Sequence, residues 1–156
     1  MGGEPVADLH VRAAQLRGIA VPPELVPLAI DEFPVLFVAA ACAKGRTVVT
    51  GAEELRVKES DRIAVMADGL RALGIAAQAT PDGMIIEGRG DQAGPVFSAG
   101  SIASHGDHRI AMAFAIAALR AGGPIRIDDT LNVATSFPGF VELACGAGLS
   151  VREIAA

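Results

Sequence analysis

Basic and acidic residues are concentrated in the segment LRVKESDR, at residues 55–62. We predict that Ser60 is the N-cap of a helix, which places Lys58 just before that helix and Arg62 in its first turn. The positive end of a helix disfavours cations. An anion bound between these two basic side chains and the free backbone N–H groups would explain why Lys58 and Arg62 lie at the helix start. The alternative is a solvated helix start in which neighbouring carboxylates neutralise both cations.

A second group of ionisable residues, SHGDHR at residues 104–109, precedes an apolar segment. Asp107 is a predicted N-cap, so His108 and Arg109 would lie in the first turn of the next helix. A capped helix with exposed His and Arg side chains would also explain this pattern. Asp31 precedes another predicted helix that has a proline in its first turn, and capping alone would account for it. Together these residues supply a carboxylate and cations that could bind an anion and transfer protons.

Each of the two groups lies at the start of a helix within an internal repeat. Asp31 and Asp107 each begin an apolar, alanine-rich segment, and they are 76 positions apart (107 minus 31). Each segment ends in a basic residue and glycine, the usual helix stop, and a short β-like segment follows. A second helix is predicted to start at Ser60 and at Ser136, again 76 positions apart. Because pseudo-symmetry can bring equivalent helix ends together, one anion site could be assembled from both groups.

Strands and helices are predicted to alternate along the chain, which is typical of an α/β or α+β layered fold. We expect a single partial domain over residues 1–156, made of repeat units at about 7–83 and 84–156. A loop at residues 88–95 would join the units, and each second helix would be followed by a further strand. The other predicted strands are residues 9–13, 16–21, 47–50, 84–87, 96–100 and 124–127.

The composition argues against several classes of function. The net charge is −5 and the pI is about 5.1, so we expect no nucleic-acid partner. The longest apolar helical stretch, residues 110–119, is too short to cross a bilayer, and the start resembles no signal peptide. We therefore expect a cytoplasmic protein with no membrane partner. Cys42 and Cys145 lie in apolar segments without metal-ligand spacing, so we expect buried inert thiols, no metal site and no cofactor.

Four motifs together resemble the C-terminal part of the 5-enolpyruvylshikimate-3-phosphate (EPSP) synthase family. In chain order they are AIDEFPVL, LRVKESDRI, HGDHRIAMAFA and NVATSFPGF, and the similarity covers nearly the whole sequence. The resemblance implies transfer of the enolpyruvyl group of phosphoenolpyruvate to the 5-hydroxyl of shikimate 3-phosphate, with release of phosphate. It also implies domains built from three βαβαββ units with the helices packed inside. The two repeats would be two of one domain's three units.

The resemblance also implies roles for individual residues. Asp31 corresponds to the carboxylate that contacts the shikimate hydroxyls, and is a candidate base for the 5-hydroxyl. Lys58 corresponds to a lysine between the two substrates, and Glu59 to a glutamate that shuttles a proton at the methylene carbon of phosphoenolpyruvate. Arg62 and Arg109 correspond to arginines that hold phosphoenolpyruvate, as planar guanidinium groups suit. Two further substrate-binding candidates are His108, an accessory neighbour, and Glu54.

The sequence departs from the family pattern in two places. Glu54 occupies a position where some members have an asparagine that contacts shikimate. Some members also have a lysine that contacts phosphoenolpyruvate near the second helix of the second unit, whereas residues 134–137 here are Ala-Thr-Ser-Phe. The sequence ATSFP at residues 134–138 is closer to that of the family branch that is often tolerant of glyphosate. Tolerance depends on residues outside this chain.

The resemblance and the ragged start of the first repeat lead us to expect a fragment. Its partners would be phosphoenolpyruvate, shikimate 3-phosphate and the missing N-terminal part of the same enzyme. The isolated chain is expected to be inactive, and its uncovered apolar face could cause self-association. Two alternatives are a non-catalytic module that binds anions, and a relative of UDP-N-acetylglucosamine enolpyruvyl transferase, which these motifs fit poorly.

Overall fold

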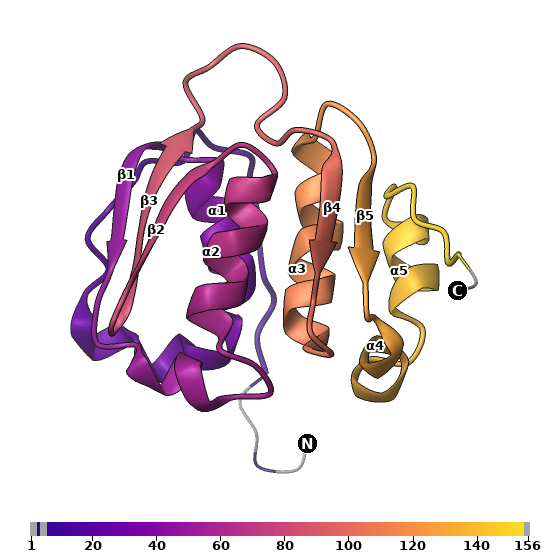
Figure 1. The fold of residues 1–156 in the computed structure, drawn as a ribbon, viewed down its shortest axis with the longest axis horizontal. Coiled ribbons are helices and arrows are strands. Elements are labelled where there is room, and N and C mark those ends of the chain that lie inside the picture. Colours follow the sequence, from indigo (N-terminus) through magenta and orange to yellow (C-terminus); the bar gives the residue numbers. More distant parts are fainter. Residues whose placement is uncertain (1–2, 4–5, 155–156) are drawn as a thin grey trace.

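Three helices lie between two β-sheets in the computed structural model of the protein, which describes residue 3 and residues 6–154 (Figure 1). The fold is therefore α/β, with these helices inside, as predicted. The helices are α1 (Phe33–Ala41), α2 (Arg62–Ala72) and α3 (His108–Ala117). One sheet has the strand order β1 (Lys44–Val49), β3 (Gly83–Arg89), β2 (Ala76–Thr80), and the other pairs β4 (Gly100–Ala103) with β5 (Ile125–Asp128).

The first repeat contains all the elements of a βαβαββ unit. Part of the predicted strand at 16–21 runs parallel to β1, through bridges from Arg17 to Lys44 and from Ala20 to Val48. The strands β1 and β2 both pair antiparallel with β3. The strand at 84–87, expected to open the second repeat, therefore completes the first sheet as part of β3. The partner β1 is distant in sequence, but β2 precedes β3 directly through the turn at residues 81–82, which is a local signal for a hairpin within the first repeat.

The second repeat keeps only the first part of this order. Strands β4 and β5 are parallel and are joined through α3, which matches the first repeat. The second helix differs, because Pro138 and Gly139 interrupt it and Gly139 has a left-handed φ of 81°. It is divided into α4 (Leu131–Ser136) and α5 (Phe140–Gly146), so Ser136 ends a helix instead of starting one. In the described residues up to 154, no strand follows α5.

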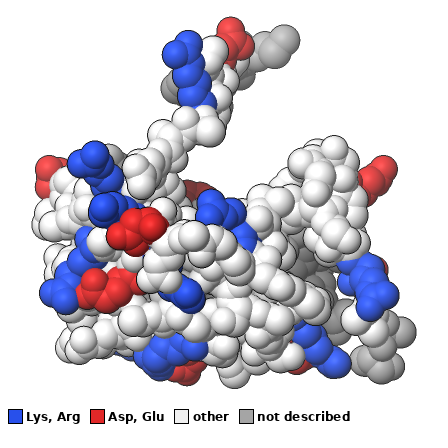
Figure 2. All heavy atoms as spheres, turned by 90° about the horizontal axis from the view of Figure 1, so that it is seen from above, with Lys and Arg blue, Asp and Glu red and all other residues white. Residues whose placement is uncertain are grey.

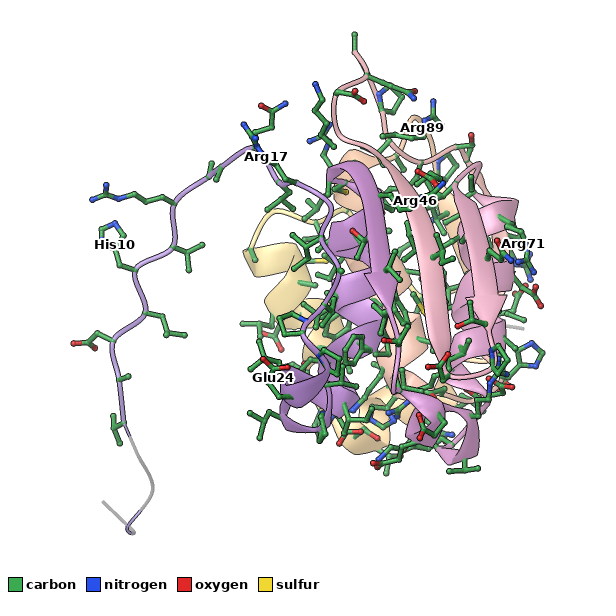
Figure 3. The ribbon with its side chains drawn as sticks, turned by 90° about the vertical axis from the view of Figure 1, so that its left-hand side faces the viewer. His10, Arg17, Glu24, Arg46, Arg71 and Arg89 are labelled. Carbon is green, nitrogen blue, oxygen red and sulfur yellow. The ribbon has the colours of Figure 1, made fainter. Side chains whose placement is uncertain are left out.

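The segment before the first repeat does not form the strand predicted at residues 9–13. Figures 2 and 3 show it standing away from the rest of the chain, with His10 far from the sheet. Leu9 and Val11 are 87% and 88% exposed, so these apolar residues are not covered. Short 3₁₀ helices complete the described elements: η1 (Pro23–Leu25), η2 (Pro27–Glu32), η3 (Glu53–Val57) and η4 (Ala118–Arg120).

A continuous apolar core holds the three central helices together. Phe37 of α1, Met66 and Leu70 of α2, and Phe114 of α3 are all buried within it. The helices α2 and α3 approach closely at Gly69, where a Cβ atom would lie 2.4 Å from the Phe114 ring. In Figure 1 all three helices begin at the lower end of the molecule. The core thus brings three positive helix ends to the same region.

Charged residues of both signs are interspersed on the surface shown in Figure 2. The outer face of the first sheet, turned toward the viewer in Figure 3, includes an ion pair between Arg46 and Glu87 at 2.5 Å. Cys42 is half-buried, and burial raises the pKa of its thiol. Cys145 is exposed, so the prediction of a buried thiol is wrong there. None of the helices in the described part of the chain is long and apolar enough to span a membrane.

Candidate functional site

The predicted site residues gather where η2 and η3 meet the starts of α2 and α3. Asp31 belongs to η2, and Lys58 and Glu59 follow η3 directly. Arg62 is the first residue of α2, while His108 and Arg109 begin α3. Salt bridges connect six of the predicted residues: Asp31, Glu54, Lys58, Glu59, Arg62 and Arg109. The two repeats therefore contribute to a single cluster.

Arg62 lies at the centre of this cluster and is 1% exposed. Its Nε group donates to Asp107 Oδ2 at 2.8 Å. Its Nη1 group donates to Asp31 Oδ1 at 3.1 Å, and Nη2 donates to Glu59 Oε2 at 2.5 Å. Burial lowers the pKa of Arg62, but the hydrogen bonds and charges of these three carboxylates outweigh it and raise the pKa. Arg62 is therefore a permanent buried cation with carboxylates on every side.

Lys58 lies beside Asp31 at the more open part of the cluster. Its Nζ atom is 3.5 Å from Asp31 Oδ1 and forms a shorter contact with Glu54. The hydrogen bond from Lys58 to Glu54 is the main cause of a raised lysine pKa, and Asp31 adds to it. Lys58 is thus charged at neutral pH, and it would stabilise negative charge rather than accept a proton.

Arg109 connects the start of α3 to η2. Its Nη1 group donates to the backbone oxygen of Asp31 and to Glu32 Oε1, both at 3.0 Å. A groove of about 430 Å³ runs alongside, lined by Asp31, His108 and Arg109 and by apolar residues of α1, α3 and α5. His108 thus faces the same groove as Asp31 and Arg109. The structure places all seven predicted site residues in this region.

Two of the predicted caps differ from the structure. Asp61, not Ser60, is the N-cap of α2, and its side chain accepts a hydrogen bond from the Ala64 N–H. Asp31 does not cap α1, because η2 continues directly into that helix and Glu32 occupies the N-cap position. Its carboxylate is turned to the basic residues instead. The prediction for Asp107 is confirmed, since it accepts hydrogen bonds from two backbone N–H groups of α3.

The charges of the cluster decide how an anion could enter it. Each of the three basic residues is already paired with a carboxylate, as the alternative of a neutralised helix start required. Asp31 and Glu59 have side chains that are 47% and 49% exposed. An incoming anion would have to replace one of these exposed carboxylates on Arg62. The site is therefore suited to exchange of one anionic partner for another.

Asp31→Asn is expected to lower stability at pH 6, and the loss is expected to shrink as the pH falls below 3.8. Burial raises the pKa of Asp31, but the charges of Lys58, Arg109 and Arg62 together outweigh it and hold the pKa below its usual 3.8. A carboxylate with a lowered folded-state pKa stabilises the fold above its unfolded pKa, and this contribution is lost as the pH falls through the folded pKa. Urea unfolding of both proteins at pH 6 and at a series of pH values below 3.8 measures the difference. A difference that does not shrink on acidification would contradict the ion pairing.

Two residues at the site, Asp107 and Arg56, make long-range contacts that the sequence did not predict. Asp107 is fully buried and bonds to Arg62 across the two repeats. Arg56 donates to the backbone oxygens of Thr80 and Pro81 at 2.5 and 2.7 Å, and to Asp61 at 2.6 Å. It thereby ties the segment that carries Lys58 to the turn between β2 and β3. The repeat offered a signal for Asp107, as the counterpart of Asp31, whereas nothing local marked Arg56.

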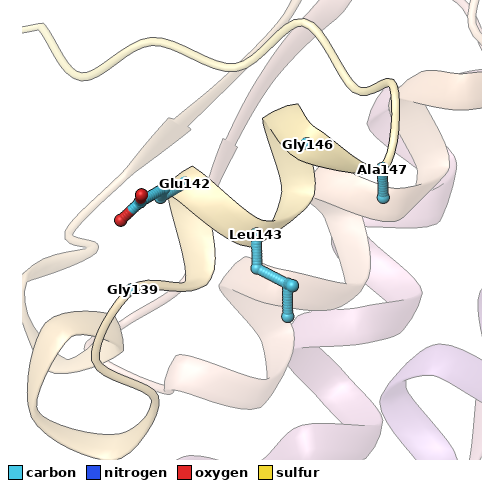
Figure 4. Close-up of a pocket in the computed structure, with 5 residues that line it drawn as sticks. All are labelled: Gly139, Glu142, Leu143, Gly146 and Ala147. Atoms are coloured by element: carbon cyan, nitrogen blue, oxygen red, sulfur yellow. The ribbon is translucent and has the colours of Figure 1, made fainter.

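A larger hollow, of about 690 Å³, lies away from this cluster on the open side of α5 (Figure 4). It is lined by Gly139, Glu142, Leu143, Gly146 and Ala147. Leu143 is 60% exposed, and Glu142 is the hollow's one ionisable residue. The described residues contain no group of three His, Cys, Asp or Glu side chains that could hold a metal ion. The ion-paired cluster is therefore the better candidate for chemistry on anions.

Comparisons with known proteins agree on one family. The family model described as EPSP synthase (3-phosphoshikimate 1-carboxyvinyltransferase) matches residues 1–143. A 3-phosphoshikimate 1-carboxyvinyltransferase from Nitrosococcus oceani is 68% identical over 153 residues, which is 98% of this chain and 33% of the relative. The enzyme of the same name from Alkalilimnicola ehrlichii is 67% identical, with the same two coverages.

A solved structure of EPSP synthase from Acinetobacter baumannii superposes with a TM-score of 0.86 at 61% identity. The superposition covers 88% of this chain and 32% of that one. The chain thus spans about a third of the length of the curated relatives it matches. A match over most of the residues and more than 60% identity leave no other family to consider: the chain belongs to the EPSP synthase family.

Proposed function

We propose that this chain is the C-terminal part of an enzyme that transfers the enolpyruvyl group of phosphoenolpyruvate to the 5-hydroxyl of shikimate 3-phosphate and releases phosphate. The observation that carries the proposal is the cluster of three basic residues and five carboxylates at the starts of α2 and α3. Family membership supports the reaction, because the matching relatives carry the name 3-phosphoshikimate 1-carboxyvinyltransferase.

The carboxylates would handle protons during addition and elimination. Asp31 is ionised at neutral pH and about half exposed, so it can accept a hydrogen bond from a substrate hydroxyl and take its proton. Glu59, also about half exposed, would protonate the methylene carbon of phosphoenolpyruvate on addition. It would then remove a proton from the resulting methyl group as phosphate leaves. Lys58 lies 3.5 Å from Asp31 and would stabilise the negative charge of the intermediate.

The arginines would bind the anionic groups of phosphoenolpyruvate. Arg62 presents two Nη groups to exposed carboxylates, and a phosphate or carboxylate of the substrate could take the place of either. Arg109 lines the neighbouring groove with His108, so both could contact the same substrate. Glu54 is paired with Lys58, so it would orient the lysine in addition to the substrate contact expected of it.

This chain provides one side of the proposed site. Exposed apolar surface beside that side supports the inference that residues outside this chain form the other. The groove next to Arg109 also contains Val35 and Phe137, which are 37% and 41% exposed. Leu143 on α5 is more exposed still. Exposed apolar surface of this kind usually packs against another unit. Because the relatives are about three times as long, we infer that the rest of the same protein covers it.

Phosphate release is the test of the proposed function. We define the hybrid enzyme as the part of the Nitrosococcus oceani relative that this chain does not match, joined to this chain. The hybrid enzyme is expected to release phosphate from phosphoenolpyruvate plus shikimate 3-phosphate, and neither of its two parts alone is expected to do so. The reason is that holding both substrates in one closed geometry supplies much of the rate. A coupled assay for inorganic phosphate measures it.

The controls separate the proposed enzyme from a non-catalytic module. Omitting shikimate 3-phosphate should abolish phosphate release, which excludes a contaminating phosphatase. A folded hybrid enzyme with no activity would refute the proposal and favour a module that only binds anions. Activity of the isolated chain at the level of the hybrid enzyme would refute the inference that this chain provides only one side of the site, because the chain would then form a complete site.

A further inference from the structure

Asp107 is a buried carboxylate to which the proposed chemistry assigns no role. It is 0% exposed and accepts five hydrogen bonds: from Arg62 Nε at 2.8 Å and Nη2 at 3.5 Å, from Ser60 Oγ at 3.1 Å, and from the backbone N–H groups of Arg109 at 3.0 Å and Ile110 at 3.4 Å. A carboxylate has about four acceptor sites, so its capacity is used. The donors come from the starts of α2 and α3, and one side chain therefore joins both helix ends.

The guanidinium group of Arg62 has two unlike sides. Asp107 occupies the Nε side, at 2.8 Å from Nε and 3.5 Å from Nη2. Asp31 and Glu59 accept from Nη1 and Nη2, and their side chains are about half exposed. A half-exposed carboxylate can be solvated when another anion replaces it, whereas a fully buried carboxylate would be left without water. Asp107 is thus the fixed partner of Arg62, and the other two are exchangeable.

We propose that Asp107 is a positioning residue that holds Arg62 by its Nε side, so that both Nη groups face the place where the anion of phosphoenolpyruvate binds. This inference rests on the proposed function. Asp107 does not touch the substrate, and it acts through Arg62 and through the backbone of Arg109. A flexible arginine loses conformational freedom when it binds an anion, and a residue that fixes it beforehand removes part of that cost.

Positioning and simple electrostatics predict opposite effects of removing this carboxylate. As a nearby negative charge, Asp107 repels an incoming anion, so its removal would tighten anion binding. As the holder of Arg62, it pre-orients the donors, so its removal would weaken binding. The sign of the change in affinity therefore decides between the two roles.

The test is Asp107→Asn, with inorganic phosphate titrated into this chain and followed through the backbone amide shifts of residues 58–62 and 107–110. Asparagine still caps α3, but its NH₂ group cannot accept from the Nε group of Arg62. The phosphate Kd is expected to rise about tenfold, as for loss of one charge-assisted hydrogen bond. Asp61→Asn is the matched control, because Asp61 also caps a helix and pairs with an arginine, Arg56. Its phosphate Kd should stay within about twofold of the unmodified value.

A second readout uses the hybrid enzyme, where Asp107→Asn should raise KM for phosphoenolpyruvate more than it lowers kcat. A purely structural role would not produce this split, because partial unfolding lowers the amount of active enzyme without changing KM. If Asp107→Asn does not fold, Ser60→Ala removes one donor to Asp107 and keeps its charge, and it should raise the phosphate Kd about twofold.

Three results would overturn the inference. The first is a phosphate Kd for Asp107→Asn, or for Ser60→Ala where the first variant does not fold, that equals or falls below that of the unmodified chain. The second is an unmodified chain whose amides at these positions do not respond to phosphate, since there would then be no anion site to position. The third is an unchanged KM for phosphoenolpyruvate in the Asp107→Asn hybrid enzyme. Turnover by the unmodified hybrid enzyme is measured separately, so failure of the proposed function is distinguishable from each of these.

Discussion

Replacing Arg62 by methionine is expected to lower the free energy of unfolding by about 3–5 kcal/mol, because the substitution leaves Asp107 as a buried charge without its main partner. Asp107 is 0% exposed and is bonded to Arg62 at 2.8 Å. Methionine has a similar length and no charge, so the lost interaction and not a large cavity would dominate. Equilibrium unfolding in urea, followed by circular dichroism, measures the change.

The matched control for Arg62→Met is Arg71→Met on the same helix. Arg71 pairs with Asp68, and both side chains are well exposed, so the loss should be within about 1 kcal/mol. The double variant Arg62→Met with Asp107→Asn should recover part of the loss, since no unpaired buried charge remains. Equal effects at Arg62 and Arg71 would contradict the central position of the buried pair.

Local patterns were sufficient to predict the parts of the structure that depend on local chemistry. The alanine-rich segments predicted α1 and α3, and the repeat suggested that the charged groups at 55–62 and 104–109 could share one site, where Arg62 and Asp107 do pair. Asp107 was predicted to be an N-cap because aspartate is a preferred residue directly before the first turn of a helix. The βαβ part of the repeat follows from the same alternation of elements.

Long-range contacts could not be predicted in this way. Arg62 lies 31 positions from Asp31 and 45 from Asp107, and nothing in the local sequence ranks these partners above nearer carboxylates. Strand β3 was assigned to the wrong repeat, although the Pro-Asp-Gly turn at residues 81–83 is a local signal that it pairs with β2. Ser60 and Asp61 are both good N-caps. Asp61 also accepts a hydrogen bond from Arg56 of η3, which in turn donates to Pro81 in the β2–β3 turn, and this contact is distant in sequence.

The same long-range contacts explain why the basic residues are tolerated at helix starts. A cation there opposes the helix dipole, and the structure offsets this with carboxylates drawn from η2, η3 and α3. Those carboxylates are of two kinds, one buried and fixed, the others exposed and exchangeable. Chemistry that moves protons near a bound anion requires the exposed kind, and Glu59 is the exposed carboxylate closest to Arg62.

Glu59→Gln is expected to lower kcat of the hybrid enzyme by about a hundredfold to ten-thousandfold, the usual loss when a general acid or base is removed. Glutamine keeps the shape of the side chain and can still accept a hydrogen bond from Arg62 Nη2. Binding of phosphoenolpyruvate should therefore change little, and the free energy of unfolding should fall by far less than in Arg62→Met. Steady-state kinetics with both substrates, together with urea unfolding, separates the chemical step from folding.

Glu53→Gln provides the control for Glu59→Gln, because Glu53 is an exposed glutamate on the adjacent helix η3, and its kcat should stay near that of the unmodified hybrid enzyme. Proton exchange gives an independent readout. Incorporation of deuterium from solvent into the methylene group of phosphoenolpyruvate should fall together with kcat if Glu59 delivers that proton. A kcat within threefold of the unmodified value would assign the proton transfer to another group. Loss of kcat with undiminished exchange would instead place Glu59 in a step after addition.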